Sequence, residues 1–125
     1  MNQAAESQGI RAVSSGRVET LMLEGELLEK DIARICEELV GRMQRGLRNV
    51  VLDFSEVDHL DYRGVPALVA RAEAFRKTGG DMKLSGLSPY LAAIFRAAGA
   101  HDVFELYPHM NDARAAFAMA RAPFV

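Results

Sequence analysis

Two kinds of hydrophobic pattern alternate along this chain, and together they predict its secondary structure. Short apolar runs typical of β-strands occupy five places, at residues 10–13, 18–25, 49–54, 82–86 and 103–107. The first two runs flank a Ser/Gly turn, which predicts a β-hairpin. The run at 49–54 is almost continuously apolar, which favours a strand covered on both faces.

Apolar residues spaced three and four apart predict four helices. The first helix has an apolar stripe formed by Leu28, Ile32, Ile35, Cys36, Leu39, Val40 and Met43. The second begins near Gly64, because Pro66 fits only in a first turn, and it ends at the Thr-Gly-Gly segment that follows. Ser88 is expected to cap a third helix that stops before Gly99, and Asn111 a fourth that runs to about residue 122.

These elements follow one another in the order β-β-α-β-α-β-α-β-α. Strands that alternate with helices require crossover connections, so we predict an α/β fold with a mixed, mostly parallel sheet. The chain has 125 residues, the size of one domain. We place this domain at residues 9–125, after a disordered start at residues 1–8 that is small and polar.

Composition narrows the range of functions. The formal net charge of −2 gives no electrostatic reason to expect a nucleic-acid partner. Cys36 is the sole cysteine, so it is expected to be a buried structural thiol in a reducing compartment. The sequence shows no signal peptide and no apolar segment near the roughly 20 residues that cross a bilayer. We therefore expect a cytoplasmic protein without direct membrane insertion.

The sequence contains no specific motif for catalysis, a metal or a cofactor. Its three histidines are scattered, and the glycine motifs of phosphate loops, dinucleotide sites and hydrolase nucleophiles are absent. Asp58, His59 and Asp61 cluster as metal ligands would, but acids beside a helix start usually form turns and caps. We therefore expect no enzyme, no cofactor and no bound metal.

The junction at residues 57–72 has an unusual feature, because Arg63 stands at the start of the second predicted helix. Helix N-termini favour acids, hydroxyls and phosphate, since unpaired N–H groups and the macrodipole make that end electropositive. A guanidinium there meets a repulsion of roughly 0.3–1 kcal/mol. Fold stability therefore gives no reason for arginine at this position.

A family resemblance rests on several segments in a fixed order. These are "VVLDFSEVDHLD", a glycine (Gly64) opening a helix, "TGGDMKLSGLSP", "AGAHDVFELYP" and a closing Ala-rich helix. From about residue 18 to residue 117 the chain resembles the STAS domain family, which anti-sigma factor antagonists and sulphate transporters share. The resemblance implies helices packed on one side of the sheet and a non-enzymatic role in bacterial signal transduction and transcription regulation. It also implies a partner that is an anti-sigma factor of the serine-kinase type.

The resemblance locates the family's regulatory site. In the family motif Asp-Ser/Thr-Ser/Thr-Gly, the residue before the glycine is phosphorylated, and phosphorylation breaks the complex. This chain has Asp61, Tyr62, Arg63 and Gly64 at the matching positions. Arg63 lacks a hydroxyl and cannot be phosphorylated, so the resemblance implies partner binding without the usual phosphoswitch at this site.

Three interpretations of Arg63 remain open. Its side chain points into solvent or pairs with Asp58 or Asp61, for a small net gain. Alternatively it is a fixed cationic contact for an acidic partner, because guanidinium pairs bidentately with carboxylates, or it contacts a nucleotide or another anion. Tyr62 beside it is either an exposed aromatic anchor or packs against the sheet edge.

We predict a partner-binding surface formed by the loop at 58–63 and the start of the following helix. Its residues are Asp58, His59, Asp61, Tyr62, Arg63, Gly64, Val65 and Leu68. The alternative is a structural STAS subunit of a larger regulatory scaffold or membrane transport complex, in homo- or hetero-oligomers with other STAS proteins. A nucleotide-binding or enzymatic role would rest on the α/β architecture alone, which does not assign function.

Overall fold

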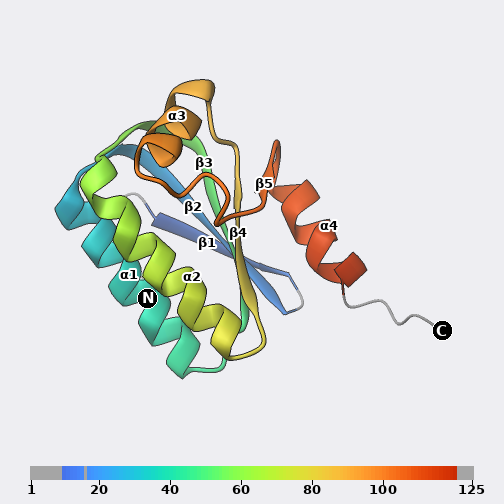
Figure 1. Cartoon of the computed structure of the whole chain (residues 1–125). Helices are drawn as coiled ribbons and strands as arrows, with labels where there is room; N and C mark the ends of the chain where they lie inside the picture. The colour runs from blue at the N-terminus through green and yellow to red at the C-terminus, as the bar shows by residue number, and fades with distance from the viewer. Residues whose placement is uncertain (1–9, 16, 121–125) are drawn as a thin grey trace.

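The computed structural model describes residues 10–15 and 17–120, and its elements follow the predicted order (Figure 1). The strands are β1 (Ile10–Ser15), β2 (Val18–Leu27), β3 (Asn49–Leu60), β4 (Asp81–Ser85) and β5 (Leu106–Tyr107). The helices are α1 (Glu29–Gln44), the 3-10 turn η2 (Tyr62–Gly64), α2 (Val65–Lys77), α3 (Pro89–Ala97) and α4 (Met110–Ala120). The predicted disordered start at residues 1–8 and the last residues of the predicted domain lie outside the described residues.

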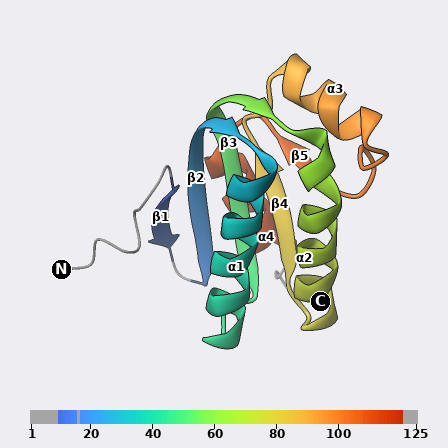
Figure 2. The same ribbon diagram turned by 90° about the vertical axis from the view of Figure 1, so that its left-hand side faces the viewer.

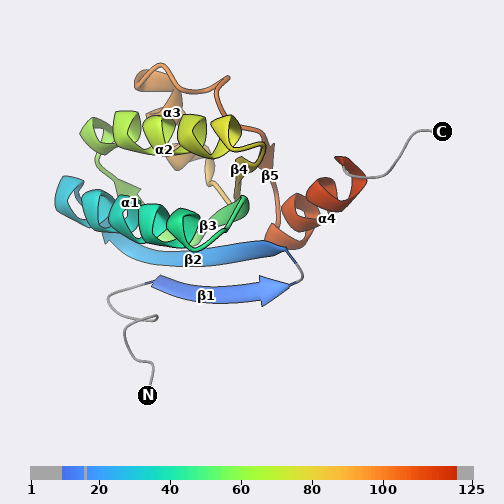
Figure 3. The ribbon, with the colours of Figure 1, turned by 90° about the horizontal axis from the view of Figure 1, so that it is seen from below.

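The five strands form one sheet in the order β1-β2-β3-β4-β5. β1 pairs with β2 antiparallel and lies at the outer edge of the sheet, whereas β2, β3, β4 and β5 pair in parallel (Figure 3). The connections between the parallel strands carry α1, α2 and α3, as parallel pairing requires. The predicted α/β fold with a mixed, mostly parallel sheet is therefore confirmed.

The main core lies between one face of the sheet and helices α1 and α2. Leu21, Leu52 and Leu84 are register partners on β2, β3 and β4, and all three are fully buried. The helices add the stripe residues Ile32 and Phe75, which are also fully buried. This apolar layer sets the position of the ends of β3 and β4, from which the chain continues into α2 and α3.

Helix α4 packs on the opposite face of the sheet, behind it when α1 and α2 are in front (Figure 2). Ala113 and Phe117 of α4 form a second buried cluster with Val51 of β3. The expectation that the helices pack on one side is therefore wrong for α4. The physical reason is the apolar run of β3, because Val51 points away from the main core and needs its own cover.

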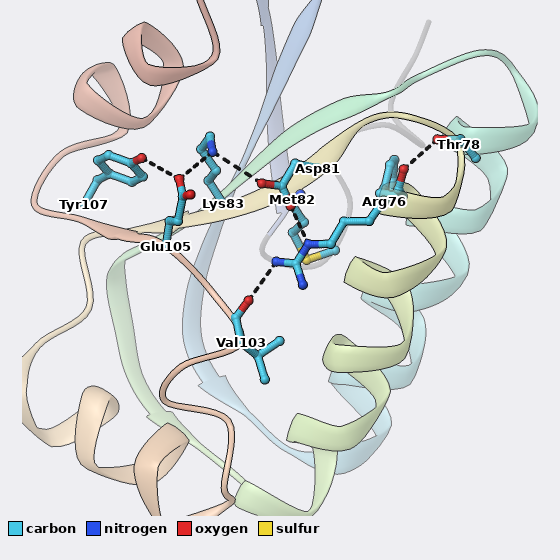
Figure 4. Close-up of polar contacts among 9 residues, drawn as sticks. Arg76, Thr78, Asp81, Met82, Lys83, Val103, Glu105 and Tyr107 are labelled. Carbon is cyan, nitrogen blue, oxygen red and sulfur yellow. Dashed lines mark hydrogen bonds and ion pairs between the residues drawn. The ribbon is translucent and has the colours of Figure 1, made fainter. Parts of the chain in front are cut away.

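A buried cation helps to hold α4 and β5 against the sheet. Lys83 of β4 donates to Glu105 at 2.6 Å and to Asp81 at 3.3 Å (Figure 4). Its Nζ also lies 4.7 Å from the centre of the Phe117 ring. Burial alone would lower the pKa of Lys83, but the hydrogen bond to Glu105 and the charges of Asp81 and Glu105 outweigh it and raise the pKa. The ammonium therefore stays charged in this apolar place.

Strand β3 is longer than predicted, and its extra residues include part of the predicted partner-binding surface. β3 continues to Leu60 instead of ending at Phe54, and its pairing with β2 shifts register twice, each time with one extra residue on β3. Such bulges break the alternation of inward and outward side chains. Val57 and Leu60 are therefore both buried although they are three positions apart, and no regular period predicts the strand here.

Smaller differences concern element ends. Leu28 is the exposed N-cap residue of α1 and not part of its buried stripe. β5 has two residues instead of five, and α4 begins at Met110, so Asn111 lies inside it and does not cap it. The Ser88 cap is confirmed, because its side chain accepts a hydrogen bond from the Leu91 N–H at 3.1 Å.

Candidate partner-binding site

The candidate site lies where β3 ends and the turn η2 leads into α2. Asp61 is the N-cap of η2, and its N–H donates to the carbonyl of Leu27 at 2.9 Å, which ties the turn to the end of β2. Gly64 is buried against α1, and a Cβ at this position would lie 2.3 Å from Cδ1 of Ile32. Only glycine therefore fits here without a shift of the neighbouring side chain.

Arg63 pairs with Asp61 while remaining at the surface. Its Nε and Nη2 donate to the two carboxylate oxygens at 3.1 and 2.7 Å, and its backbone N–H donates to Oδ1 at 2.9 Å. The Arg63 side chain is nevertheless 67% exposed. The Asp61 carboxylate thus caps the turn and offsets the guanidinium charge, which explains how arginine is tolerated at an electropositive helix start.

The same contacts set the ionisation of the pair. The side-chain and backbone hydrogen bonds from Arg63 lower the pKa of Asp61 from 3.8 to about 2. The hydrogen bond to Asp61 and the charges of Asp61 and Glu29 raise the pKa of Arg63. Both groups are therefore charged at physiological pH, and the turn presents an ion pair instead of a free cation.

Two exposed tyrosines flank this ion pair. Tyr62 is 59% exposed and Tyr90, from the first turn of α3, is 54% exposed. The hydroxyl of Tyr90 lies 2.6 Å from Nδ1 of His59, and the centres of their rings are 5.8 Å apart. These side chains line an open hollow, formed by His59, Leu60, Asp61, Tyr62, Arg63, Tyr90, Ile94 and Ala97.

The eight predicted site residues differ in how far they reach the surface. Tyr62, Arg63 and Asp58 are exposed, and His59 and Asp61 are half-buried. Asp58 and His59 belong to the end of β3 and not to a loop. Gly64, Val65 and Leu68 are buried, so they support the turn from the core and are not exposed to a partner.

Sequence reasoning missed the contribution of α3 to this hollow. Tyr90, Ile94 and Ala97 lie about thirty positions along the chain from the predicted loop, as the 31-residue separation of His59 and Tyr90 illustrates. The signal that could have found them is topological. β3 and β4 are parallel neighbours, so the elements that follow their carboxyl ends meet at one edge of the sheet.

Metal-binding clusters and membrane-spanning helices are both absent from the described part of the chain. Within residues 10–15 and 17–120, no group of three or more His, Cys, Asp or Glu side chains is placed to hold a metal ion. Among the same residues, no helix has the length and apolar character needed to span a membrane. Burial raises the pKa of the Cys36 thiol, which is half-buried and unpaired with another cysteine.

Comparison with known proteins places this fold in a family. The model of the STAS domain matches residues 9–113. BtrV of Bordetella bronchiseptica, which carries the name of an anti-sigma factor antagonist, is 26% identical over 98 residues, covering 78% of this chain and 84% of BtrV.

Solved structures share the same fold. TM1081 of Thermotoga maritima superposes with a TM-score of 0.78 at 15% identity, covering 86% of this chain and 92% of that chain. The anti-sigma factor antagonist SpoIIAA of Bacillus, in its unphosphorylated form, superposes with a TM-score of 0.74 at 16% identity. The match covers 87% of this chain and 96% of SpoIIAA. The chain belongs to the STAS domain family, and it shares the fold of the anti-sigma factor antagonists compared above.

Proposed function

We propose that this protein is a non-enzymatic, cytoplasmic antagonist that binds an anti-sigma factor of the serine-kinase type and is not regulated by phosphorylation at the family site. The observation that carries the proposal is the side chain at that site. Arg63 stands directly before the buried Gly64, is exposed, and has no hydroxyl to accept a phosphoryl group. The turn that would present a serine is intact, whereas the residue it presents has no hydroxyl for a serine kinase to phosphorylate.

The chemistry of the surface favours recognition through aromatic groups and directed hydrogen bonds. Asp61 offsets the charge of Arg63, and Asp58 and Glu29 nearby are exposed acids, so the surface does not offer a net positive charge to an acidic partner. Tyr62 and Tyr90 supply exposed rings, the residue type that most often dominates protein interfaces. We therefore place the contact on Tyr62, Arg63, His59 and Tyr90, with the buried glycine and α2 as their support.

The proposal can be tested with the serine-kinase-type anti-sigma factor of the same organism as the probe. Calorimetric titration is expected to show binding to the wild-type chain that is unchanged after incubation with ATP and Mg²⁺. Arg63→Ser restores a hydroxyl, so the kinase is expected to transfer the γ-phosphoryl group of ATP to it and to release ADP. The complex between the two proteins is then expected to dissociate. Arg63→Lys is the matched control, since it keeps a cation and cannot be phosphorylated at this position.

The result that would contradict the proposal is a wild-type chain that fails to bind this probe. ATP-dependent loss of the wild-type complex, with phosphate found by mass spectrometry on another hydroxyl, would contradict the absence of a phosphoswitch. A complex of Arg63→Ser that resists ATP despite stoichiometric phosphorylation would show that the turn has lost its regulatory geometry.

A further inference from the structure

A second surface feature lies away from the candidate site, between the outer sides of α1 and α2. These two helices run side by side in the same direction along one face of the sheet (Figure 2). The groove between them has a volume of about 470 Å³ and is lined by Ala33, Cys36 and Val40 of α1 and by Ala67 and Ala70 of α2. The lining alanines are exposed, so no described element covers this groove.

The outer side of α2 is apolar for a surface helix. Such helices usually place charged residues opposite their buried stripe. The outer positions in the first half of α2 are instead the exposed Pro66, Ala67 and Ala70. Small side chains at a helix surface permit another helix to pack at a short interaxial distance, so the outer face of α1 and α2 can approach another helical face closely.

Opposite charges line the two walls of the groove. Glu37 lies on α1 and Arg71 on α2, and neither forms an ion pair with a described residue. A two-fold axis parallel to the two helices, at the mouth of the groove, would set α1 of one copy against α2 of the second copy. Glu37 would then face Arg71 of the second copy, and symmetry would repeat the contact. With one acid and one base on facing walls, the groove of one copy is complementary in charge to the groove of a second copy.

We propose that the groove between α1 and α2 takes a second copy of this chain, in a two-fold dimer joined by reciprocal contacts of Glu37 and Arg71. The 16 residues of α1 and 13 of α2 give helices about 24 and 20 Å long. With helix diameters of about 10 Å, each copy contributes about 400 Å², below the interface of a stable complex. The dimer is therefore weak and reversible, and the groove that forms it shares no lining residue with the hollow at Arg63.

The test is sedimentation of the full chain over concentrations from about 10 μM to about 1 mM. The wild type is expected to shift from monomer to dimer across this range. Glu37→Arg and Arg71→Glu are each expected to weaken self-association about tenfold or more, and the double variant to restore it. Glu73→Arg is the matched control, because it makes the same charge change on α2 outside the groove and is expected to leave self-association unchanged.

Cys36 provides a second readout that does not depend on the variants. It is the only cysteine of the chain and lines the groove, so its alkylation by a maleimide is expected to slow as the dimer forms. A wild type that stays monomeric at about 1 mM, or single variants that associate like the wild type, would overturn the proposal. Protection of Cys36 only after the anti-sigma factor is added would assign the groove to that partner and would also overturn it.

Discussion

The hydroxyl of Tyr90 and Nδ1 of His59 lie 2.6 Å apart and join the start of α3 to the end of β3. Their rings also stack obliquely, at an angle of 31° between planes. The contact holds an exposed tyrosine in one orientation beside Arg63 and Tyr62. A preorganised aromatic side chain costs less conformational entropy when a partner binds it.

Tyr90→Ala is accordingly expected to weaken binding of the anti-sigma factor about tenfold or more, with no change in the folded structure. Tyr90→Phe keeps the ring and removes the bond to His59, so an intermediate loss is expected. Calorimetric titration measures both. Met119→Ala removes another exposed apolar side chain, on α4, and serves as the control. Equal affinity of the Tyr90→Ala variant and the wild type would exclude α3 from the interface.

Gly64→Ala is expected to destabilise the fold by about 1–3 kcal/mol, because the new methyl group overlaps Ile32 of α1. Urea unfolding followed by circular dichroism measures the change. Gly41→Ala is the matched control, since a Cβ there meets only the end of the Arg45 side chain at 3.5 Å. This second variant is expected to stabilise α1 by about 0.5–1 kcal/mol, so the two identical substitutions should have opposite signs.

The Asp61–Arg63 pair predicts a specific dependence of stability on pH. The pKa of Asp61 is lowered in the folded protein from 3.8 to about 2, so the pair stabilises the folded state above about pH 4. This contribution is lost as the pH falls from 3.8 towards 2. Asp61→Asn keeps a capping oxygen and removes the charge. Its unfolding free energy should therefore lie below that of the wild type at neutral pH, with a difference that shrinks towards about pH 2.

Unfolding of the wild type and Asp61→Asn at several pH values measures this effect. Asp58→Asn is the control, because Asp58 is exposed and has no hydrogen bond or ion pair with another described residue through its side chain. A difference between the wild type and Asp61→Asn that stays constant down to about pH 2 would show that the carboxylate charge plays no part.

Lys83→Ala is expected to loosen α4 specifically. The substitution removes the contact with the Phe117 ring and the bonds to Glu105 and Asp81, for a loss of about 1–3 kcal/mol. Hydrogen exchange should become faster in α4 and β5 before it changes in α1 and α2. Lys77→Ala, at the exposed end of α2, is the control. Uniformly faster exchange in all helices would contradict a local role for Lys83.

Local patterns in the sequence predicted most of the architecture, because the buried apolar residues of most elements recur at the regular spacing of a helix or a strand. The helix at α3 is an example, with Ser88 at its cap and Gly99 beyond its end. The end of β3 was not predictable in this way, since its bulges interrupt the period that identifies a strand. The face covered by α4 is likewise decided by Val51 and Phe117, which are distant in sequence.

The candidate site shows the same division. Asp61, Arg63 and Gly64 are neighbours in the chain, so a motif of four residues was enough to name them as candidates. The hollow also needs Tyr90, which meets His59 only because β3 and β4 end at the same edge of the sheet. The pairing of Arg63 with Asp61 depends on side-chain geometry, and the sequence could only leave it as one of several interpretations.

Thr20 has a buried hydroxyl in the sheet that lowers the stability of the fold. The residue is fully buried in β2, with Val13 and Val51 as its register partners on β1 and β3. Its Oγ1 has no hydrogen-bond partner among the described residues. A buried hydroxyl without a partner loses its hydration and gains nothing in return, at a cost of about 1–3 kcal/mol.

Thr20→Val replaces this hydroxyl by a methyl group of similar size and is expected to raise the free energy of unfolding by about 1 kcal/mol. Thr78→Val is the matched control, because Oγ1 of Thr78 donates to the carbonyl of Phe75 at 2.7 Å. There the same substitution removes a formed hydrogen bond and is expected to lower stability by about 0.5–1.5 kcal/mol. Urea unfolding of both variants measures the pair of effects. A loss of stability in Thr20→Val comparable to that in Thr78→Val would contradict this prediction. It would mean that the Thr20 hydroxyl forms a hydrogen bond in solution, with a buried water molecule as its partner.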